Sequence, residues 1–596
     1  MYSHYAPACG KPYVVAPHFI FALTISHVEI MVMKASNSSR LMGSHSMATT
    51  QTLNRKTAGN ATQPKDRLSG LKENWKSDLM SGFIIFLIAL PLCLGVAMAS
   101  GVPPMAGIIS AVIGGLIVSQ ISGSYVTING PAAGLIVVIL GTVDRFGGGG
   151  QGYHVALAAT VVAGLALFVL GLFKAGELGH FFPSSVVHGM LAAIGIIIMS
   201  KQFHIMLGVS PHAREPLELI AEIPHSLVSL NPQVSLIGLS SLVLLIVHAS
   251  TGNKIIKRVP APLIVVLVAI GLGAALGLDH KHVYSFAQQN YLLDPAKVLV
   301  SLPSNVMDGV AHPDFSKIGM YSFWLAVFSI TFVQGVETLL SAAAVDRLDR
   351  FGRQSNLSSD VAAVGLGSAI SGLIGGLPLI AEIVRSSANV DNGARTRWSN
   401  FFHGMFMLVC VLLAASLLNR IPLCALAALL VFTGYRLASP RVFKETFEIG
   451  IEQAIIFTTT IIATLATDLL IGVTVGIVTK LAVHIMNGAP PLGLFSPDIT
   501  VTAGTDGTYF VDIRRAAIFS NYLPMKKQLD ILPSGARVQV DLSGALLVDH
   551  TVMDKLHHYA EAYRAKGGVF EICGLERHSS VSHHPLSARR LRPLPG

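Results

Sequence analysis

Charged residues are scarce in this sequence: they make up 13% of its 596 residues, whereas a typical soluble domain has about 25%. Cysteine is scarce too, and its five copies form no CxxC pair, standing at Cys9, Cys93, Cys410, Cys424 and Cys573. That scatter argues against a disulfide framework and against a zinc site. The phosphate-binding pattern G-x-x-x-x-G-K-[ST] is also absent, so ATP does not drive this protein. We therefore expect neither an enzyme nor a bound cofactor or metal.

Apolar residues, in contrast, are abundant. They make up 52% of the chain, glycine occurs 56 times, and the mean hydropathy is +0.60. Because small residues let helices approach closely in lipid, this composition predicts an α-helical protein that crosses the membrane many times. The net charge of +9 lies largely in loops and tails, and we interpret it as a topology signal and not as affinity for nucleic acid.

Composition divides the chain into four parts. Residues 1–79 are predicted to form an N-terminal cytoplasmic tail, with Met42 and Met47 as alternative starts, and residues 80–488 carry the apolar spans. Residues 492–576 alternate strand and helix patterns, which predicts a small cytoplasmic α/β domain, and 577–596 are predicted to be a basic tail. The expected elements of the α/β domain are three strands and one helix: Thr508–Ile513, Arg537–Leu542, Val569–Cys573 and Met553–Lys566.

Fourteen apolar segments follow one another in 80–488, as two sets of seven. The first set lies near 80–98, 104–122, 131–143, 153–173, 183–200, 233–250 and 260–277. The second set lies near 321–343, 357–373, 379–391, 400–418, 420–437, 452–467 and 469–487. In each set the third segment is short and follows glycine and proline. Because seven is odd, the second set must run in the opposite direction, so we expect two inverted repeats with discontinuous third and tenth spans.

Basic residues predict the orientation of these spans. With the N-terminus inside, the short inner loops hold many of the loop cations: Lys254, Lys257, Arg258, Arg347, Arg350, Arg353, Arg395, Arg397, Arg436, Arg441 and Lys444. The longer outer loops have fewer lysines and arginines for their length. This distribution follows the positive-inside rule, so both termini are predicted to be cytoplasmic.

The two interrupted spans predict an anion site. Asn129-Gly130-Pro131-Ala132-Ala133-Gly134 opens the third span, and Gly375-Gly376-Leu377-Pro378 opens the tenth. Half-helices that meet head to head would point unpaired N–H groups and positive dipole ends into one gap. The expected backbone donors are Ala132, Ala133, Ala381 and Glu382. The alternative interpretation is that both breaks are packing kinks.

Several blocks together resemble one family, the SulP inorganic anion transporters with a C-terminal STAS domain. The blocks keep the family order over about 80–590: Ala89–Gly95 with Ala99–Pro104, Phe182–Met190, Glu337–Ser341, Gly375–Arg385, and Val540–Gly544. The resemblance implies fourteen spans, in which a core domain (spans 1–4 and 8–11) moves against a gate domain (spans 5–7 and 12–14). It also implies small anions as substrates, such as sulfate, bicarbonate, chloride or dicarboxylates, and a homodimer.

We therefore expect a secondary active transporter of the sulfate or bicarbonate class, working by alternating access in a cell's inner (plasma) membrane and coupled to protons or sodium. The expected substrate site comprises Pro91, Cys93, Gly130, Pro131, Ala132, Ala133, Ala381, Glu382, Ile383 and Arg385. Matched to the family, Arg385 falls at the arginine near the anion site. The alternative role for Arg385 is a partner for Glu382, three residues earlier on the same helix face.

Glu337 is the expected coupling residue, with Gln334 and Ser341 on the same helix face. In sodium-coupled relatives an acid and a hydroxyl at these positions help to hold the cation, and in proton-coupled relatives a glutamate here carries the proton. Glu382 departs from the bicarbonate-type pattern, which has small residues and a hydroxyl here. An acid beside an anion repels it unless it is protonated or paired, so proton–anion symport also fits.

Other functions fit part of this pattern. A nucleobase transporter shares the architecture, but Arg385 and the C-terminal domain favour anions. An uncoupled anion channel or exchanger, or a membrane regulator, would have no use for an intramembrane acid at Glu337.

Several further residues have structural interpretations. His188 is predicted to pack in apolar surroundings, and Asp468 to cap a helix or end a turn. Asp549 or Thr551 is predicted to cap the C-terminal helix, with phosphorylation of Thr551 as the alternative. His578, His583 and His584 are predicted to lie in a solvated tail and not to bind metal.

Overall fold

The computed structural model describes residues 63–131, 133–213, 215–253, 256, 259–303, 305–505 and 507–592. Most of these, 64–245 and 259–592, belong to one compact unit, and all contacts discussed below lie inside it. Residues 1–62 lie outside the described part of the chain, as do Ala132, Lys254, Lys257 and Arg258, so the predictions made for them have no structural counterpart.

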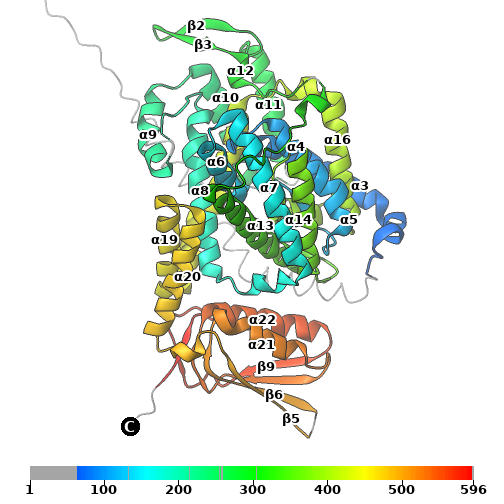
Figure 1. Ribbon diagram of the computed structural model, residues 1–596, viewed down its shortest axis with the longest axis vertical. Helices are drawn as coiled ribbons and strands as arrows, with labels where there is room; N and C mark the ends of the chain where they lie inside the picture. Colours follow the sequence, from blue (N-terminus) through cyan, green and yellow to red (C-terminus); the bar gives the residue numbers. More distant parts are fainter. Residues whose placement is uncertain are drawn as a thin grey trace, which may run out of the picture. The chain divides into compact units, whose positions relative to one another are not determined.

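The first half of the membrane region is helical (Figure 1). Its helices follow the predicted segments in order: α3 Arg67–Ala99; α4 Pro104–Ile113, continued by a π-helical turn Gly114–Val118 and α5 Ser119–Ile121; α6 Ile136–Arg145; α7 Gly149–Leu172; α8 Ser184–Met206; α10 Pro232–Ser250; and α11 Ala261–Ala275. The first helix begins at Arg67, so the predicted tail 1–79 is wrong for residues 67–79. They extend the first apolar helix, whose Asp66 side chain caps it by accepting from the Arg67 N–H.

The second half of the membrane region is also helical. It contains α13 Tyr321–Leu348, α14 Leu357–Leu373, α15 Ile383–Asp391, α16 Trp398–Leu418, α17 Leu423–Leu437, α19 Ile451–Ala466 and α20 Leu469–Met486. Within the described residues, nine helices are long and apolar enough to cross a membrane, and three shorter apolar helices accompany them. α6 and α15, with 10 and 9 residues, are the half-length helices expected after the two breaks. Asp468 caps α20 by accepting from the Ile471 N–H at 2.9 Å, as predicted.

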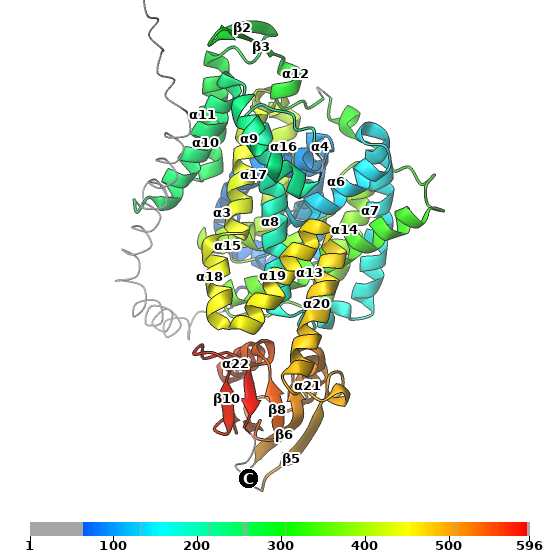
Figure 2. The same cartoon turned by 90° about the vertical axis from the view of Figure 1, so that its left-hand side faces the viewer.

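The helices associate in two groups. α7 packs on α14 and on α13, and α3 packs on α16 and α4, as the two views show. Separately, α8 packs on α17 and α19, and α19 packs on α20 (Figure 2). The helices of the first group all belong to the core set that the family resemblance implies, and those of the second group all belong to its gate set.

Short elements connect the helices. Between α8 and α10 lies α9 Pro216–Val228, and a hairpin, β2 His282–Phe286 and β3 Gln289–Leu293, precedes α12 Pro295–Val298. α18 Pro440–Ile449 follows α17, and three 3-10 turns span Ala175–His180, Val306–Gly309 and Pro491–Gly493. His188, near the start of α8, is exposed, so the prediction that it packs in apolar surroundings is wrong.

The C-terminal domain is a seven-stranded sheet with two helices on one face (Figure 1). The strand order is β10-β11-β8-β6-β7-β9, and β5 pairs with β6. β6, β7, β8 and β9 pair in parallel, as strand–helix alternation predicts. The elements are β5 Asp498–Ala503, β6 Thr508–Ala517, a 3-10 turn Phe519–Asn521, α21 Tyr522–Asp530, β7 Arg537–Asp541, β8 Ala545–Val548, α22 His550–Ala565, β9 Val569–Cys573, β10 His578–Ser580 and β11 Arg589–Leu591.

The predicted basic tail is wrong for residues 578–591. β10 and β11 pair antiparallel with each other, and β11 pairs with β8, so this segment completes the sheet. His578, expected in a solvated tail, is buried, and its Nε2 lies 2.7 Å from the Ala545 carbonyl oxygen. This segment is ordered because its strands pair with each other and with β8, and composition alone does not indicate such pairing.

The last membrane helix and the C-terminal domain meet in a buried polar cluster, here called the α20–α22 joint: Lys480, His484, Asp549 and Thr551. Lys480 Nζ lies 3.1 Å from Asp549 Oδ2 and donates to Thr551 Oγ1 at 2.6 Å, and both charged side chains are fully buried. Asp549 also caps α22 by accepting from the Val552 N–H at 2.6 Å, as predicted. Thr551 is 1% exposed, so its hydroxyl is enclosed and not presented for phosphorylation.

Candidate functional site

The two chain breaks lie side by side. β1, Ile128–Gly130, pairs antiparallel with β4, Ile380–Glu382, so that Asn129 faces Ala381 and Gly130 faces Ile380. These strands immediately precede the two half-helices, with a 3-10 turn Ala133–Leu135 leading into α6. The prediction that the third and tenth segments meet at their breaks is therefore confirmed.

Serines hold the extended segment before β4 in place. Ser110 and Ser371 both donate to the Leu377 carbonyl, at 2.9 and 2.8 Å, and Ser368 Oγ accepts from the Leu379 N–H at 2.8 Å. An extended chain in an apolar region must satisfy its polar groups within the protein. Small hydroxyl side chains on α4 and α14 do this, and their position in apolar helices is the sequence signal that could have revealed them.

Arg385 is at the centre of the site and is 1% exposed. Its Nε lies 2.5 Å from Glu382 Oε2, and its two terminal nitrogens reach the Pro131 carbonyl at 3.2 Å and Cys93 Sγ at 3.4 Å. One guanidinium thus joins α3, the break before α6 and the start of α15. Both roles considered for Arg385 are compatible with this geometry, and the pairing with Glu382 is the one that is present.

Gly130 permits this arrangement, because a Cβ at this position would lie 2.9 Å from an Arg385 terminal nitrogen. Cys93 is fully buried on α3, and its sulfur takes part directly in the site. Pro91 is buried two residues earlier in the same helix. Residues two apart on a helix point to different faces, so Pro91 shapes α3 without sharing the Cys93 position.

Glu337 on α13 is buried and lies against the other half-helix. A Cβ on Gly134, in the turn that leads into α6, would come within 1.5 Å of Glu337 Oε1. Only glycine leaves room for the carboxyl group here. The predicted coupling acid therefore lies beside the start of α6, as its proposed role requires.

Gln334 and Ser341 differ in their surroundings. Gln334 is fully buried, and its amide donates to the Ser368 hydroxyl and, at 2.7 Å, to the Leu379 carbonyl. It thereby ties α13 to α14 and to the chain just before β4. Ser341 is half-buried one turn beyond Glu337. Gln334 thus has a positioning contact, whatever its part in ion coupling.

The remaining predicted residues lie around the start of each half-helix. Ala133 is half-buried and Ala381 is buried in β4. Ile383 opens α15, and its side chain is 41% exposed, so the start of this half-helix is accessible. Ala132 lies outside the described residues. Neither half-helix has a side-chain cap: Leu135 precedes α6 and Glu382 precedes α15, and neither side chain bonds to the first turn.

A buried polar network that the sequence interpretation missed lies behind β1. Asn400 on α16 donates to Asn129 Oδ1 at 3.1 Å, and His403 Nδ1 lies 3.4 Å from Asn400 Oδ1. Asn389 on α15 donates to the Val126 carbonyl at 2.8 Å, and Ser386 Oγ accepts from the Ile128 N–H at 2.9 Å. Polar residues inside apolar helices were the available signal. They hold β1 against α15 and α16.

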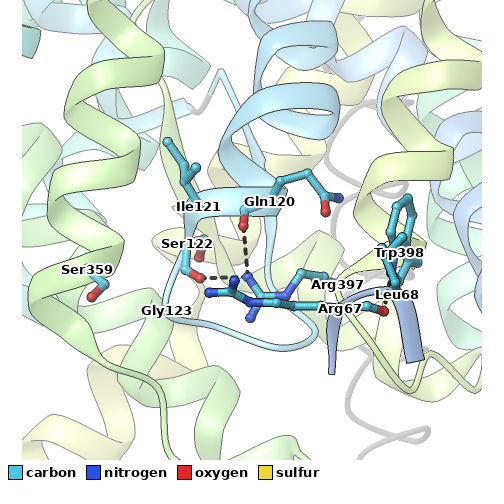
Figure 3. Close-up of a pocket in the computed structure, with 9 residues that line it drawn as sticks. All are labelled: Arg67, Leu68, Gln120, Ile121, Ser122, Gly123, Ser359, Arg397 and Trp398. Carbon is cyan, nitrogen blue, oxygen red and sulfur yellow. Dashed lines mark hydrogen bonds between the residues drawn. The ribbon is translucent and has the colours of Figure 1, made fainter. Parts of the chain in front are cut away.

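A separate cavity of about 660 Å³ lies at the start of α3 and α16 (Figure 3). Its lining contains none of the predicted site residues. Arg397 donates here to the Gln120 and Ser122 carbonyls, at 3.4 and 2.8 Å, and pairs with Asp66 at 2.7 Å. Arg397, predicted as a loop charge, is thus fully engaged in joining three segments.

Among the described residues, no group of three histidine, cysteine, aspartate or glutamate side chains is placed to hold a metal ion. The site instead offers uncapped helix starts, a buried cation and two carboxylates. Such a site is suited to an anion that arrives with a compensating positive charge.

The sulfate permease family model matches residues 75–460 of this chain. The bicarbonate transporter BicA of Picosynechococcus sp. (strain ATCC 27264 / PCC 7002 / PR-6) is 25% identical over 409 residues, which cover 68% of this chain and 69% of BicA. The match to the family model covers both half-helices and all the predicted site residues.

Two solved structures share the fold. The transmembrane domain of a cyanobacterium bicarbonate transporter BicA has a TM-score of 0.56 and 23% identity, covering 67% of this chain and 97% of that one. The murine Solute Carrier 26 family member A9 anion transporter, in the inward-facing state, has a TM-score of 0.59 and 15% identity, covering 83% of this chain and 85% of that one. At these identities the likeness concerns the fold alone.

Proposed function

Because the chain belongs to the sulfate permease family, we propose that it is a secondary active transporter that carries an inorganic anion of the sulfate or bicarbonate class by alternating access, coupled to protons or sodium. The SulP resemblance is thereby confirmed. The protein is a multi-pass membrane anion transporter and not an enzyme, in keeping with the naming of its relatives as transporters.

The observation that carries this proposal is the pairing of β1 with β4. It brings the uncapped starts of α6 and α15 to one place, beside the buried Arg385 and Glu337. Unpaired N–H groups and the positive end of each helix dipole attract an anion. The N-terminal residues of the two half-helices, together with Arg385, are the substrate-binding groups in this proposal.

Coupling is assigned to Glu337, with Ser341 and Gln334 on the same helix. Its carboxyl group lies against Gly134, at the start of α6. A proton or sodium ion on this carboxylate would remove a negative charge from beside the substrate anion. Anion and cation would then favour each other's binding, which is the thermodynamic requirement for symport.

The proposal extends to the whole assembly. The α8, α17, α19 and α20 group would move against the group that holds the site, in a homodimer in the inner (plasma) membrane with both termini cytoplasmic. The C-terminal α/β domain, within 492–592, is assigned as a STAS domain on the strength of its mixed sheet and its position after the last membrane helix.

Uptake by proteoliposomes tests the proposal. Radiolabelled sulfate and bicarbonate would be offered with an inward proton gradient, an inward sodium gradient, or neither, to the wild type, Glu337→Gln, and Glu445→Gln. Glu445 is the matched control, since it lies exposed on α18 and pairs with Arg441. We expect one gradient to drive uptake of at least one anion, and Glu337→Gln alone to lose that dependence. Flux that ignores every gradient in all three proteins would favour a channel.

A further inference from the structure

The cation at the centre of the site already has an anion beside it. Arg385 is 1% exposed, and its only carboxylate partner within 4 Å among the described residues is Glu382, three residues earlier on the same chain segment. The other guanidinium contacts are a backbone carbonyl and a thiol, both uncharged acceptors: Pro131 and Cys93. Glu382 therefore supplies the one negative charge in direct contact with Arg385.

The two members of this pair are held very differently. The guanidinium is fixed by three chain segments, whereas the Glu382 side chain is 18% exposed. Glu382 is also the residue before the first turn of α15, where the neighbouring Ile383 and Val384 side chains are 41% and 40% exposed. The Glu382 oxygen that lies against Arg385 is itself buried, but the side chain as a whole is partly exposed, so it has a direction in which to move that the guanidinium lacks.

We propose that Glu382 is a tethered counter-anion: its carboxylate occupies the place on Arg385 that a substrate oxyanion takes, so that substrate binds as Glu382 leaves. This inference deepens the proposed function and rests on it. A carboxylate oxygen 2.5 Å from Nε marks where a substrate oxygen would sit, which favours oxyanions as the substrate class.

The cost of leaving a buried charge unpaired supports an exchange of one anion for another on Arg385. A buried guanidinium left without a partner is strongly unfavourable, whereas replacing one anion by another keeps it paired at every stage. The other ionisable groups that face the pair are Glu337 from α13, Cys93 from α3 and His403 from α16. Glu337 is the only other acid among them, so a displaced, still ionised Glu382 would add repulsion that a coupling cation relieves.

A static ion pair predicts the opposite result from a tethered competitor. If Glu382 only supports Arg385, removing its charge loosens the site and weakens anion binding. If Glu382 competes, removing its charge leaves Arg385 available, and apparent affinity rises because more of the protein is competent to bind. The sign of the change therefore distinguishes the two.

The test measures equilibrium binding of radiolabelled sulfate and bicarbonate to the purified full-length protein. For Glu382→Gln we expect the apparent Kd for at least one of them to fall about tenfold. Glu445→Gln should match the wild type, and the double variant Glu382→Gln/Arg385→Gln should lose the gain. Unchanged or weaker binding by a folded Glu382→Gln protein would overturn the inference.

A second measurement covers the case in which the variant does not fold, and uptake measured alongside binding separates this inference from the proposed function. If Glu382→Gln does not fold, infrared difference spectra of the unaltered protein should show a carboxylate change on adding sulfate or bicarbonate, and binding without such a change would overturn the inference. If the wild type takes up the anion but Glu382→Gln does not bind it more tightly, the tethered counter-anion is contradicted and the proposed transport function is not. If no protein shows uptake or binding, both proposals are contradicted.

Discussion

Arg385–Glu382 in the membrane region and Lys480–Asp549 in the α20–α22 joint are both ion pairs with a fully buried cation, yet they are enclosed differently. In the joint neither side chain is exposed, and Lys480 has Thr551 as a second acceptor. In the site the glutamate side chain is 18% exposed and next to an accessible helix start. One pair is closed to solvent on both sides, and the other is open on the side of the acid.

This difference indicates different roles. A buried charge that loses its partner destabilises the protein by several kcal/mol, so a pair closed on both sides resists separation. A pair open on one side can exchange its anion for another from solution without leaving the cation bare. The joint holds the last membrane helix and the C-terminal domain together, whereas the open pair is the one that fits the proposed exchange of anions.

The largest expected effect comes from opening the closed pair. Lys480→Met removes the nearer basic partner of the buried Asp549 and leaves His484, whose Nε2 lies 3.6 Å from Asp549 Oδ2. We expect a loss of about 3 kcal/mol, seen as a lower midpoint of thermal unfolding. The double variant Lys480→Met/Asp549→Asn should regain most of it, since asparagine keeps the cap of α22 and carries no charge. If the wild type and Lys480→Met unfold at the same temperature, the closed Lys480–Asp549 pair does not contribute to stability as we expect.

Acid should open the same joint. Burial works to raise the pKa of Asp549, but Lys480 and His484 outweigh it, so this pKa lies below its usual range. A lowered folded-state pKa gives stability that is present above the unfolded value, about 4, and is lost as the pH falls below it. The unfolding midpoint of the wild type should hold from pH 7 to about 5 and then drop more steeply than that of Asp549→Asn. Parallel profiles would contradict this.

In the site, moving the coupling acid should affect transport more than stability. Gly134→Ala places a methyl group where Glu337 Oε1 lies, so the carboxyl group must rotate away. We expect coupled uptake to fall about tenfold or more, ~1.4 kcal/mol in activation free energy. The matched control is Gly141→Ala on α6, where a Cβ meets no atom within 4 Å. Similar uptake by both variants would contradict the assignment of coupling to Glu337.

The smallest expected effect comes from an exposed helix cap, Asp468, and shows how much of the effect at the joint is due to charge burial. Asp468 and Asp549 both cap helices, but Asp468 is exposed and, in the part of the chain that the structure describes, forms no ion pair. Asp468→Ala should cost about 1 kcal/mol, the usual value of a cap. Thermal unfolding beside Lys480→Met measures this. A loss as large as that of Lys480→Met would mean that capping, and not charge burial, dominates at the joint.

Much of the fold was predictable, because apolar runs and strand patterns are local. Val569–Cys573 was expected as a strand and is β9, and the helix expected at Met553–Lys566 is α22. The strands β5, β8, β10 and β11 were missed. β10 and β11 are three residues each and gain their order from pairing with other strands, which no local pattern encodes.

For the site, glycine, proline and intramembrane charge identified the breaks, Arg385 and Glu337, because each is unfavourable in lipid without a reason. The supporting residues were not predictable in the same way. Gln334 was expected to serve ion coupling on the basis of helix spacing, yet its contacts to Ser368 and Leu379 depend on α14 and on the chain before β4. Spacing along one helix says nothing about which other helix faces it.

The strands at the end of the sheet also set an order of assembly during synthesis. Arg590, in the middle of β11, lies 3.1 Å from Glu452 at the start of α19, and Asn487 donates to the same carboxylate. Arg590 follows Glu452 by 138 residues. At a synthesis rate of roughly 5–20 residues per second, Arg590 is made on the order of ten seconds after Glu452. The newly inserted last helices therefore pass through an interval in which this acid has Asn487 but lacks its arginine.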